Sequence, residues 1–147
     1  MDIVERLQAD MKQAMKNKDK FRLSVIRMIR SEIQNLEISK SGSVSEDDVI
    51  EVLSREKKKR SESLEEYKQA GRDDIVEDLK SEISILEEYL PAQLSDDELK
   101  AIIQDAIHKV GATSPKDMGK VMQEVMPQVK GRADGKQVNR FVSELLN

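Results

Sequence analysis

The chain has 147 residues, no cysteine and no tryptophan, and 37% of its residues are charged. Its formal net charge of −4 argues against a protein whose whole surface binds nucleic acid, and the absence of cysteine excludes disulfides, thiolate metal sites and cysteine nucleophiles. No leader or transit-peptide pattern is present, and no stretch reaches the roughly 18 apolar residues that cross a bilayer. We therefore expect a cytoplasmic protein that does not enter membranes.

Apolar residues recur at helical spacing along the chain, and no segment alternates with the period of a strand. The first helix is expected to begin after Asp2, which forms a capping box with Glu5. A second helix is expected from Phe21 to about Leu36, before a flexible connection at 39–43. The apolar stripe of the first helix consists of Ile3, Leu7, Met11, Ala14 and Met15, and that of the second includes Phe21, Val25, Ile26, Ile29, Ile33 and Leu36.

The third predicted helix begins at Ser45, with Asp48 at the reciprocal capping position. Its stripe includes Val49, Val52, Leu53, Leu64 and Tyr67. A polar run at 56–62 interrupts this stripe, so the helix is expected either to project past its neighbours or to pack there through lysine and arginine stems. Gly71 ends this helix. A fourth helix begins at Asp73 or Asp74 and ends before Pro91, because the residue before a proline disfavours the α conformation.

Three further helices are predicted between residues 95 and 145. Their start and stop signals are Ser95 with Glu98, Gly111, Ser114 with Pro115, and Asp134 with Gln137. Their expected core residues are Leu99, Ile102, Ile103, Ala106, Ile107 and Val110, then Met118, Val121, Met122, Val125 and Met126, and finally Val138, Phe141, Val142 and Leu145. The sequence thus predicts an all-α fold of seven helices, with a four-helix domain at 1–90 and a three-helix domain at 91–147.

Groups that carry catalysis are scarce in this sequence. His108 is the only histidine, and its neighbours have no metal-ligand spacing, so we interpret it as a surface residue. The carboxylate pairs that begin at Asp73 and Asp96 stand at helix starts, where capping and the helix dipole explain them. No phosphate-binding, dinucleotide or calcium motif is present. We therefore predict no catalytic residue, no metal and no cofactor.

Two basic segments remain. The run Lys57–Arg60 spreads around a whole helix and has glutamates at i,i+4 spacing, which favours a solvated helix face. The C-terminal segment places cations opposite two predicted core stripes and in the loop that joins them. These candidate nucleic-acid contacts are Lys116, Lys120, Lys130, Arg132, Lys136 and Arg140. Phe141 points to the core, so recognition of the phosphate backbone is favoured over base stacking. Ordinary solvated lysines are the alternative interpretation.

The segments Tyr89–Leu94, Asp117–Met122 and Lys130–Lys136 resemble the YqeY family of small bacterial proteins, and the likeness covers essentially the whole chain. The family is similar to the tail region of the B subunit of the glutamine-dependent aspartyl/glutamyl-tRNA amidotransferase, a region associated with holding tRNA. The resemblance therefore implies a helical accessory module that works with tRNA and with a protein partner in tRNA-dependent amidation. The catalytic parts of that enzyme have no counterpart in this sequence.

Three hypotheses follow. The first is a non-catalytic, tRNA-associated module that binds RNA backbone through the C-terminal cations. The second is a helical protein-interaction adaptor without RNA, suggested by the acidic balance outside that patch and by the third helix. The third is a carbon–nitrogen ligase that uses glutamine as amide donor, which the family label implies although no set of catalytic side chains supports it.

Overall fold

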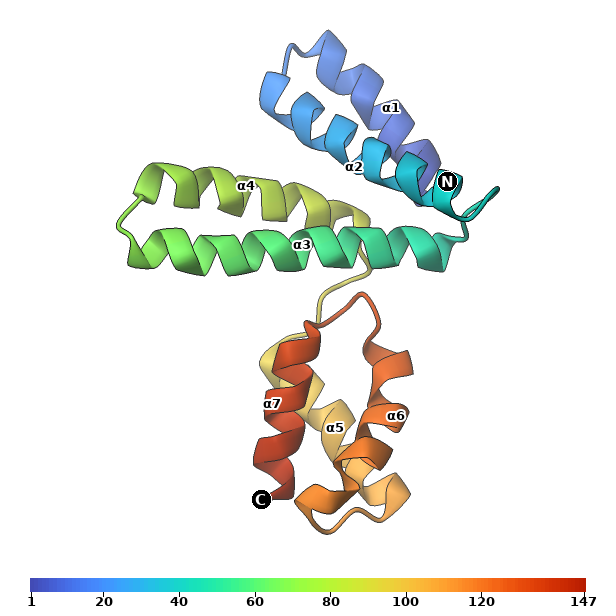
Figure 1. The fold of residues 1–147 in the computed structure, drawn as a ribbon, viewed down its shortest axis with the longest axis vertical. Helices are drawn as coiled ribbons and strands as arrows, with labels where there is room; N and C mark the ends of the chain where they lie inside the picture. Colours follow the sequence, from blue (N-terminus) through green and yellow to red (C-terminus); the bar gives the residue numbers. More distant parts are fainter. The chain divides into compact units, whose positions relative to one another are not determined.

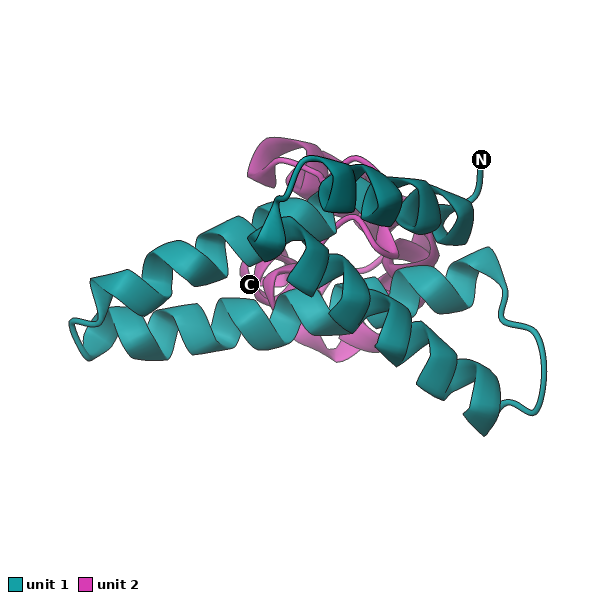
Figure 2. Ribbon diagram, turned by 90° about the horizontal axis from the view of Figure 1, so that it is seen from above, with its two compact units in different colours: residues 1–90 teal, residues 91–147 magenta.

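A computed structural model describes all 147 residues and confirms the all-α fold (Figure 1). The chain forms two compact units, residues 1–90 and 91–147, which are coloured separately in Figure 2. It contains no strand. The seven predicted α-helices are present, and one short 3-10 helix lies between the fifth and the sixth. In chain order the elements are α1 (Ile3–Lys16), α2 (Lys20–Ser39), α3 (Glu46–Gln69), α4 (Asp73–Tyr89), α5 (Asp96–Val110), η1 (Pro115–Asp117), α6 (Met118–Val129) and α7 (Gly135–Leu146).

The predicted start and stop signals define most of the helix ends. Capping boxes form at Asp2, Ser45 and Ser95, where each side-chain oxygen accepts a backbone N–H of the first turn. Gly71 and Gly111 adopt the left-handed conformation, with φ of +72° and +67°, and end the helices before them. Helix boundaries in this chain thus follow local chemistry.

The start of α6 differs from the prediction. Ser114 makes no side-chain capping bond, and residues Pro115–Asp117 form the 3-10 turn η1 before α6 begins at Met118. Asp117 makes no side-chain cap bond to α6 either, and its Oδ2 atom instead accepts the backbone N–H of Thr113, upstream of η1, at 2.9 Å. The first turn closes as a 3-10 turn in which the N–H of Asp117 donates to the carbonyl of Ser114 at 3.0 Å, and α6 begins three residues after Pro115.

In residues 1–90, the α1–α2 pair packs on an antiparallel α3–α4 hairpin (Figure 1). Three residues that the sequence assigns to the apolar stripes are exposed: Met15 by 52%, Phe21 by 40% and Tyr67 by 38%. Each stands within two residues of an end of its helix. The buried residues of this core are Ile3, Leu7, Val25, Ile26, Ile29, Ile33, Val49, Val52, Leu53, Ile85, Leu86, Tyr89 and Leu90.

The polar centre of α3 packs through ion pairs. Glu56 is only 6% exposed. Its carboxylate lies 3.2 Å from Lys59 Nζ and 3.4 Å from Arg60 Nη1. Arg60 Nε in turn lies 3.7 Å from Glu82 Oε2 on α4. The sequence left open whether α3 projects past its neighbours or packs there through lysine and arginine stems, and each holds in part. This polar layer packs against α4, and the hairpin continues past the ends of α1 and α2 (Figures 1 and 2).

Residues 91–147 form a three-helix bundle with its own core. The buried residues are Leu99, Ile103, Ala106, Val121, Val125, Val129, Val138, Phe141, Val142 and Leu146. Met126 was expected in this core but is 38% exposed. Val125 and Val129 occupy the inward face of α6, which leaves Met126 about 100° away from Val125 around the helix. This small valine-rich core positions the outer faces of α6 and α7.

Candidate nucleic-acid interface

The cations of α6 and α7 lie opposite the residues that these helices bury. On α6, Val121 and Val125 are fully buried while Lys120 is exposed. On α7, Val138 is buried while Lys136 and Arg140 are exposed. Because one residue advances about 100° around a helix, burying the valines directs these cations to solvent.

The loop between α6 and α7 is held against the segment 92–94. Its backbone pairs with that segment where the N–H of Leu94 donates to the carbonyl of Arg132 at 2.9 Å. The amide of Gln93 donates to the carbonyl of Gly131 at 2.7 Å, and Arg132 Nε donates to the carbonyl of Ala92 at 3.2 Å. Arg132 is half-buried, so in this structure its side chain positions the loop.

The six predicted contact residues do not form one compact cluster. Lys130, Arg132 and Lys136 gather at the α6–α7 loop, whereas Lys116 lies in η1 at the opposite end of α6. Lys116 and Lys130 are 14 residues apart, or about 20 Å at the helical rise of 1.5 Å. The remaining pair, Lys120 and Arg140, is exposed on α6 and on α7, and we refer to the six cations together as the basic face.

Acidic neighbours reduce the charge at parts of this face. Lys109 of α5 pairs with Glu124 of α6 at 2.7 Å, and Arg140 lies 3.9 Å from Glu144 in the next turn of α7. Asp117 accepts the N–H of Thr113, a bond that lowers the pKa of its carboxyl group, and the positive charge of Lys120 lowers it further. The Arg140–Glu144 pair is exposed and long, and it contributes little stability.

Sequence reasoning missed one cation of this surface. Lys100 of α5 places its Nζ atom 4.7 Å from the centre of the Phe141 ring, and the guanidinium carbon of Arg140 lies 5.0 Å from the same centre. Phe141 is 3% exposed, so both cations cover an aromatic ring that is not open to bases. Lys100 directly follows the buried Leu99. This position at the edge of the apolar stripe of α5 was the sequence signal that could have identified Lys100 as a cation beside the core.

The other basic run belongs to the α3–α4 hairpin. Lys57 Nζ lies 3.2 Å from Glu87 Oε1 of α4, and Lys59 and Arg60 pair with Glu56. The observed Glu56–Arg60 pair has the i,i+4 spacing that the sequence suggested. Lys57 and Arg60 therefore pair within the hairpin, while Lys58 and Lys59 are exposed.

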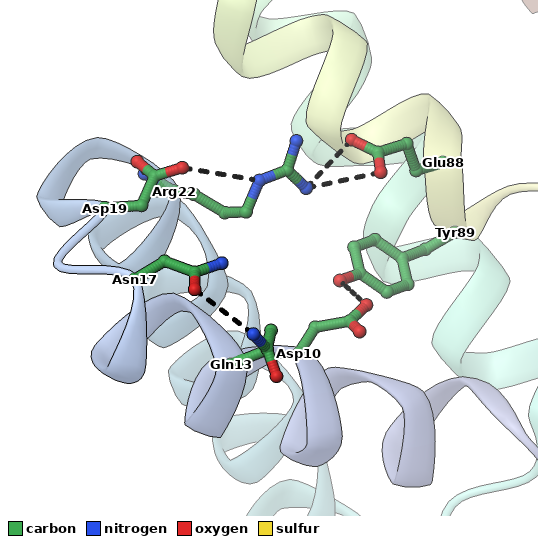
Figure 3. A network of polar contacts seen from close by, with 7 residues as sticks. All are labelled: Asp10, Gln13, Asn17, Asp19, Arg22, Glu88 and Tyr89. Atoms are coloured by element: carbon green, nitrogen blue, oxygen red, sulfur yellow. Dashed lines mark hydrogen bonds and ion pairs between the residues drawn. The ribbon is translucent and has the colours of Figure 1, made fainter.

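A second polar network joins three helices of residues 1–90 (Figure 3). Arg22 of α2 bridges Asp19 at 3.8 Å and Glu88 of α4 at 3.0 Å. The hydroxyl of Tyr89 donates to the carboxylate of Asp10 on α1, and Arg6 stacks over the Tyr89 ring at 5.0 Å. Burial raises the pKa of Tyr89, and the bond to Asp10 raises it further. This network fastens the end of α4 to α1 and α2.

Histidine and acidic side chains are the metal-ligand types that this cysteine-free chain contains. His108 is exposed on α5, and no cluster of three or more histidine or acidic side chains is arranged to hold a metal ion. None of the helices is both long and apolar enough to span a bilayer.

These features define a class of small all-α proteins in which a helical unit is followed in the chain by a three-helix bundle with exposed cations on α6 and α7. The chain belongs to the YqeY family, because the model described as Yqey-like protein matches residues 4–146. It is 30% identical to "Altered inheritance of mitochondria protein 41, mitochondrial" of Pyrenophora tritici-repentis, over 98% of this chain and 81% of that protein. Proteins of the same name match at 34% identity in Lachancea thermotolerans (78% of this chain, 63% of the relative) and at 31% in Clavispora lusitaniae (75% and 65%).

These relatives correct the expected location. The sequence led us to predict a cytoplasmic protein, but the matching fungal proteins are named as mitochondrial, and this finding overturns the prediction. The prediction depended on the lack of a targeting pattern in the residues of this chain, which is weak physical evidence. The chain spans less than two thirds of the Lachancea and Clavispora proteins, so those relatives contain additional sequence.

Proposed function

We propose that residues 91–147 bind RNA through its phosphate backbone, with tRNA as the class of ligand. We further propose that the chain acts as a non-catalytic accessory module. The observation that carries this proposal is the exposure of Lys120 on α6 and of Lys136 and Arg140 on α7. Lys116 and Lys130 extend the basic face at its two ends, while Arg132 holds the loop. The resemblance to the tail of a tRNA-dependent amidotransferase subunit points the same way.

The form of the face favours backbone recognition. Its aromatic residue, Phe141, is buried beneath Lys100 and Arg140, so no exposed ring is offered for stacking on a base. The cations extend over about 20 Å along the helix axis, as estimated from the helical rise. Such a row matches successive phosphates of a folded RNA, which proteins recognise by shape and backbone. An accessory role leaves the chemistry of amidation to a protein partner.

A filter-binding titration of the full chain with total tRNA tests the proposal. Each phosphate contact steepens the fall of log K with log salt by about 0.7 to 0.9. We expect binding at low salt. The double variant Lys136→Glu with Arg140→Glu should weaken this binding and reduce the slope of log K against log salt by roughly 1.5.

A matched control carries the same charge change elsewhere. Lys12→Glu with Lys58→Glu reverses two exposed helical lysines of residues 1–90, and this control should bind tRNA much as the wild type does. The proposal is rejected if the wild type does not bind tRNA at low salt. It is equally rejected if the two double variants weaken binding by the same factor, since net charge alone would then explain the effect.

A further inference from the structure

The far end of the α3–α4 hairpin carries apolar side chains that do not belong to a core. Because α3 and α4 are antiparallel and Arg60 meets Glu82, Leu64 and Leu79 fall in the next layer toward the tip, followed by Tyr67 and Ile75 beside the buried Val76. We call these four residues, Leu64, Tyr67, Ile75 and Leu79, the distal seam. None of them is part of the core of residues 1–90. Tyr67 is 38% exposed, and the other three are only partly buried.

The end of the core explains why the seam is uncovered. The Glu56–Arg60–Glu82 layer forms a polar boundary, and Arg60 Nη2 also contacts Met28 Sδ of α2 at 3.7 Å. On the near side of this boundary, α1 and α2 cover the hairpin. On the far side the hairpin continues as two helices alone, which both views of these residues show (Figures 1 and 2). A pair of helices buries only part of its apolar surface without a third.

The charges around the distal seam are mostly negative. Residues 62–80 contain seven acidic and three basic side chains, a net charge of −4. Two of the three cations already pair within the tip, Arg72 with Asp74 at 3.4 Å and Lys80 with Glu77 at 3.6 Å. Glu66 and Asp78 directly neighbour Tyr67 and Leu79, about 100° around each helix, so their carboxylates flank the seam.

We infer that the distal seam docks a cationic amphipathic helix of a partner protein. Leucines on such a helix would cover Leu64, Tyr67 and Leu79 as α1 and α2 cover the near half of the hairpin, and its lysines or arginines would meet the acidic flanks. Partly exposed tyrosine and leucine side chains are typical anchors for a helix in a groove. The negative charge disfavours RNA and anionic lipid at this surface. This site is therefore separate from the basic face of α6 and α7.

Synthetic peptides and the full chain provide the test. The probe is an 18-residue helical peptide with leucines on one face and lysines on the other. Its two matched peptides are a scrambled sequence of the same composition and a version with glutamate in place of lysine. Fluorescence anisotropy measures affinity, and hydrogen exchange locates the contact. The amphipathic cationic peptide should bind at least about tenfold more tightly than either matched peptide, with new protection confined to residues 62–80.

Two hairpin variants separate the apolar contribution from the charge contribution. Tyr67→Ser removes the exposed ring, and Glu66→Lys with Asp78→Lys reverses the flanks; each should weaken the amphipathic peptide by about tenfold. The matched control, Asp97→Lys with Asp105→Lys, makes the same charge change at exposed positions of α5 and should leave affinity within about twofold. Circular dichroism verifies that each variant keeps the helical content of the wild type.

Three results would overturn the inference. Equal binding of the scrambled peptide would reduce the effect to non-specific charge attraction. Equal weakening by the α5 control, or protection outside residues 62–80, would place the contact elsewhere. A salt-sensitive dimer in sedimentation that disappears in Glu66→Lys with Asp78→Lys would assign the seam to a second copy of this chain. Failure of tRNA binding would leave the inference untouched, because the hairpin variants change none of the cations of α6 and α7.

Discussion

The Tyr89–Asp10 hydrogen bond gives a direct test of how α4 is fastened to α1. Tyr89 is 2% exposed, and its hydroxyl donates to the Asp10 carboxylate. In Tyr89→Phe the ring remains, and so does the stacking of Arg6 on it, while the hydroxyl bond is lost. A hydrogen bond to a charged acceptor contributes about 1.5–3 kcal/mol. Asp10 is only partly buried and regains water, so we expect a loss of about 1–2 kcal/mol.

The pH dependence of this bond has a defined sign. Burial and the Asp10 carboxylate raise the pKa of Tyr89 above its ordinary value of 10.0. A group whose pKa is raised on folding contributes stability that is fully present below the unfolded pKa. That contribution falls as the pH rises above about 10, by up to roughly 1.4 kcal/mol per pH unit. Tyr89→Phe lacks this group, so the stability difference between the proteins should shrink above pH 10.

Urea denaturation followed by circular dichroism measures the change in the free energy of unfolding. Hydrogen exchange assigns that change to residues 1–90 or 91–147. A loss of 1–2 kcal/mol corresponds to a fall of about 4–16 °C in Tm for a unit of this size. Two outcomes would show that the bond does not fasten α4 to α1. The first is a free energy of unfolding for Tyr89→Phe at pH 7 that stays within about 0.3 kcal/mol of the wild type. The second is a loss of stability above pH 10 that is the same in the variant and the wild type.

Three further perturbations follow from the same structure. Ile103→Ala in the core of residues 91–147 should cost about 2–5 kcal/mol, and hydrogen exchange should show that bundle opening while residues 1–90 keep their protection. Gly119→Ala should stabilise α6 by about 0.5 kcal/mol, because an added Cβ there meets no atom within 4 Å; a lower Tm would contradict this. The hydrogen bond from Lys40, at 2.8 Å, lowers the pKa of Asp48 from 3.8 to about 2. The stability that Asp48 contributes is therefore present above pH 4 and lost as the pH falls toward 2. In urea denaturation at a series of pH values, Asp48→Asn should show a smaller fall in the free energy of unfolding over this range.

The helices and most of their ends were predictable because their signals are local. Capping boxes at Asp2, Ser45 and Ser95 and the left-handed glycines at 71 and 111 involve residues within one turn of each other. Where the expected cap bond does not form, the prediction was less accurate. Neither Ser114 nor Asp117 makes a side-chain cap bond, and α6 begins at Met118, after the 3-10 turn η1.

The candidate interface was predictable in direction but not in extent. The alternation of Val138 with Lys136 and Arg140 is enough to expose the cations of α7. The sequence did not reveal that Arg132 bonds to Ala92, or that Lys100 reaches Phe141 from another helix. These contacts join residues about 40 positions apart, so their geometry depends on how the helices pack and not on the periodicity of any one helix.

The sequence by itself determined seven amphipathic helices, the signals that end most of them and the outward direction of the cations on α7, because each depends on spacing within a single helix. Tertiary structure decided which stripe residues become core, as the exposure of Tyr67 and Met126 shows. It also decided that the polar centre of α3 closes the core through Arg60 and Glu82. Burial requires a covering partner, and whether a helix reaches far enough to provide that cover depends on packing between distant segments.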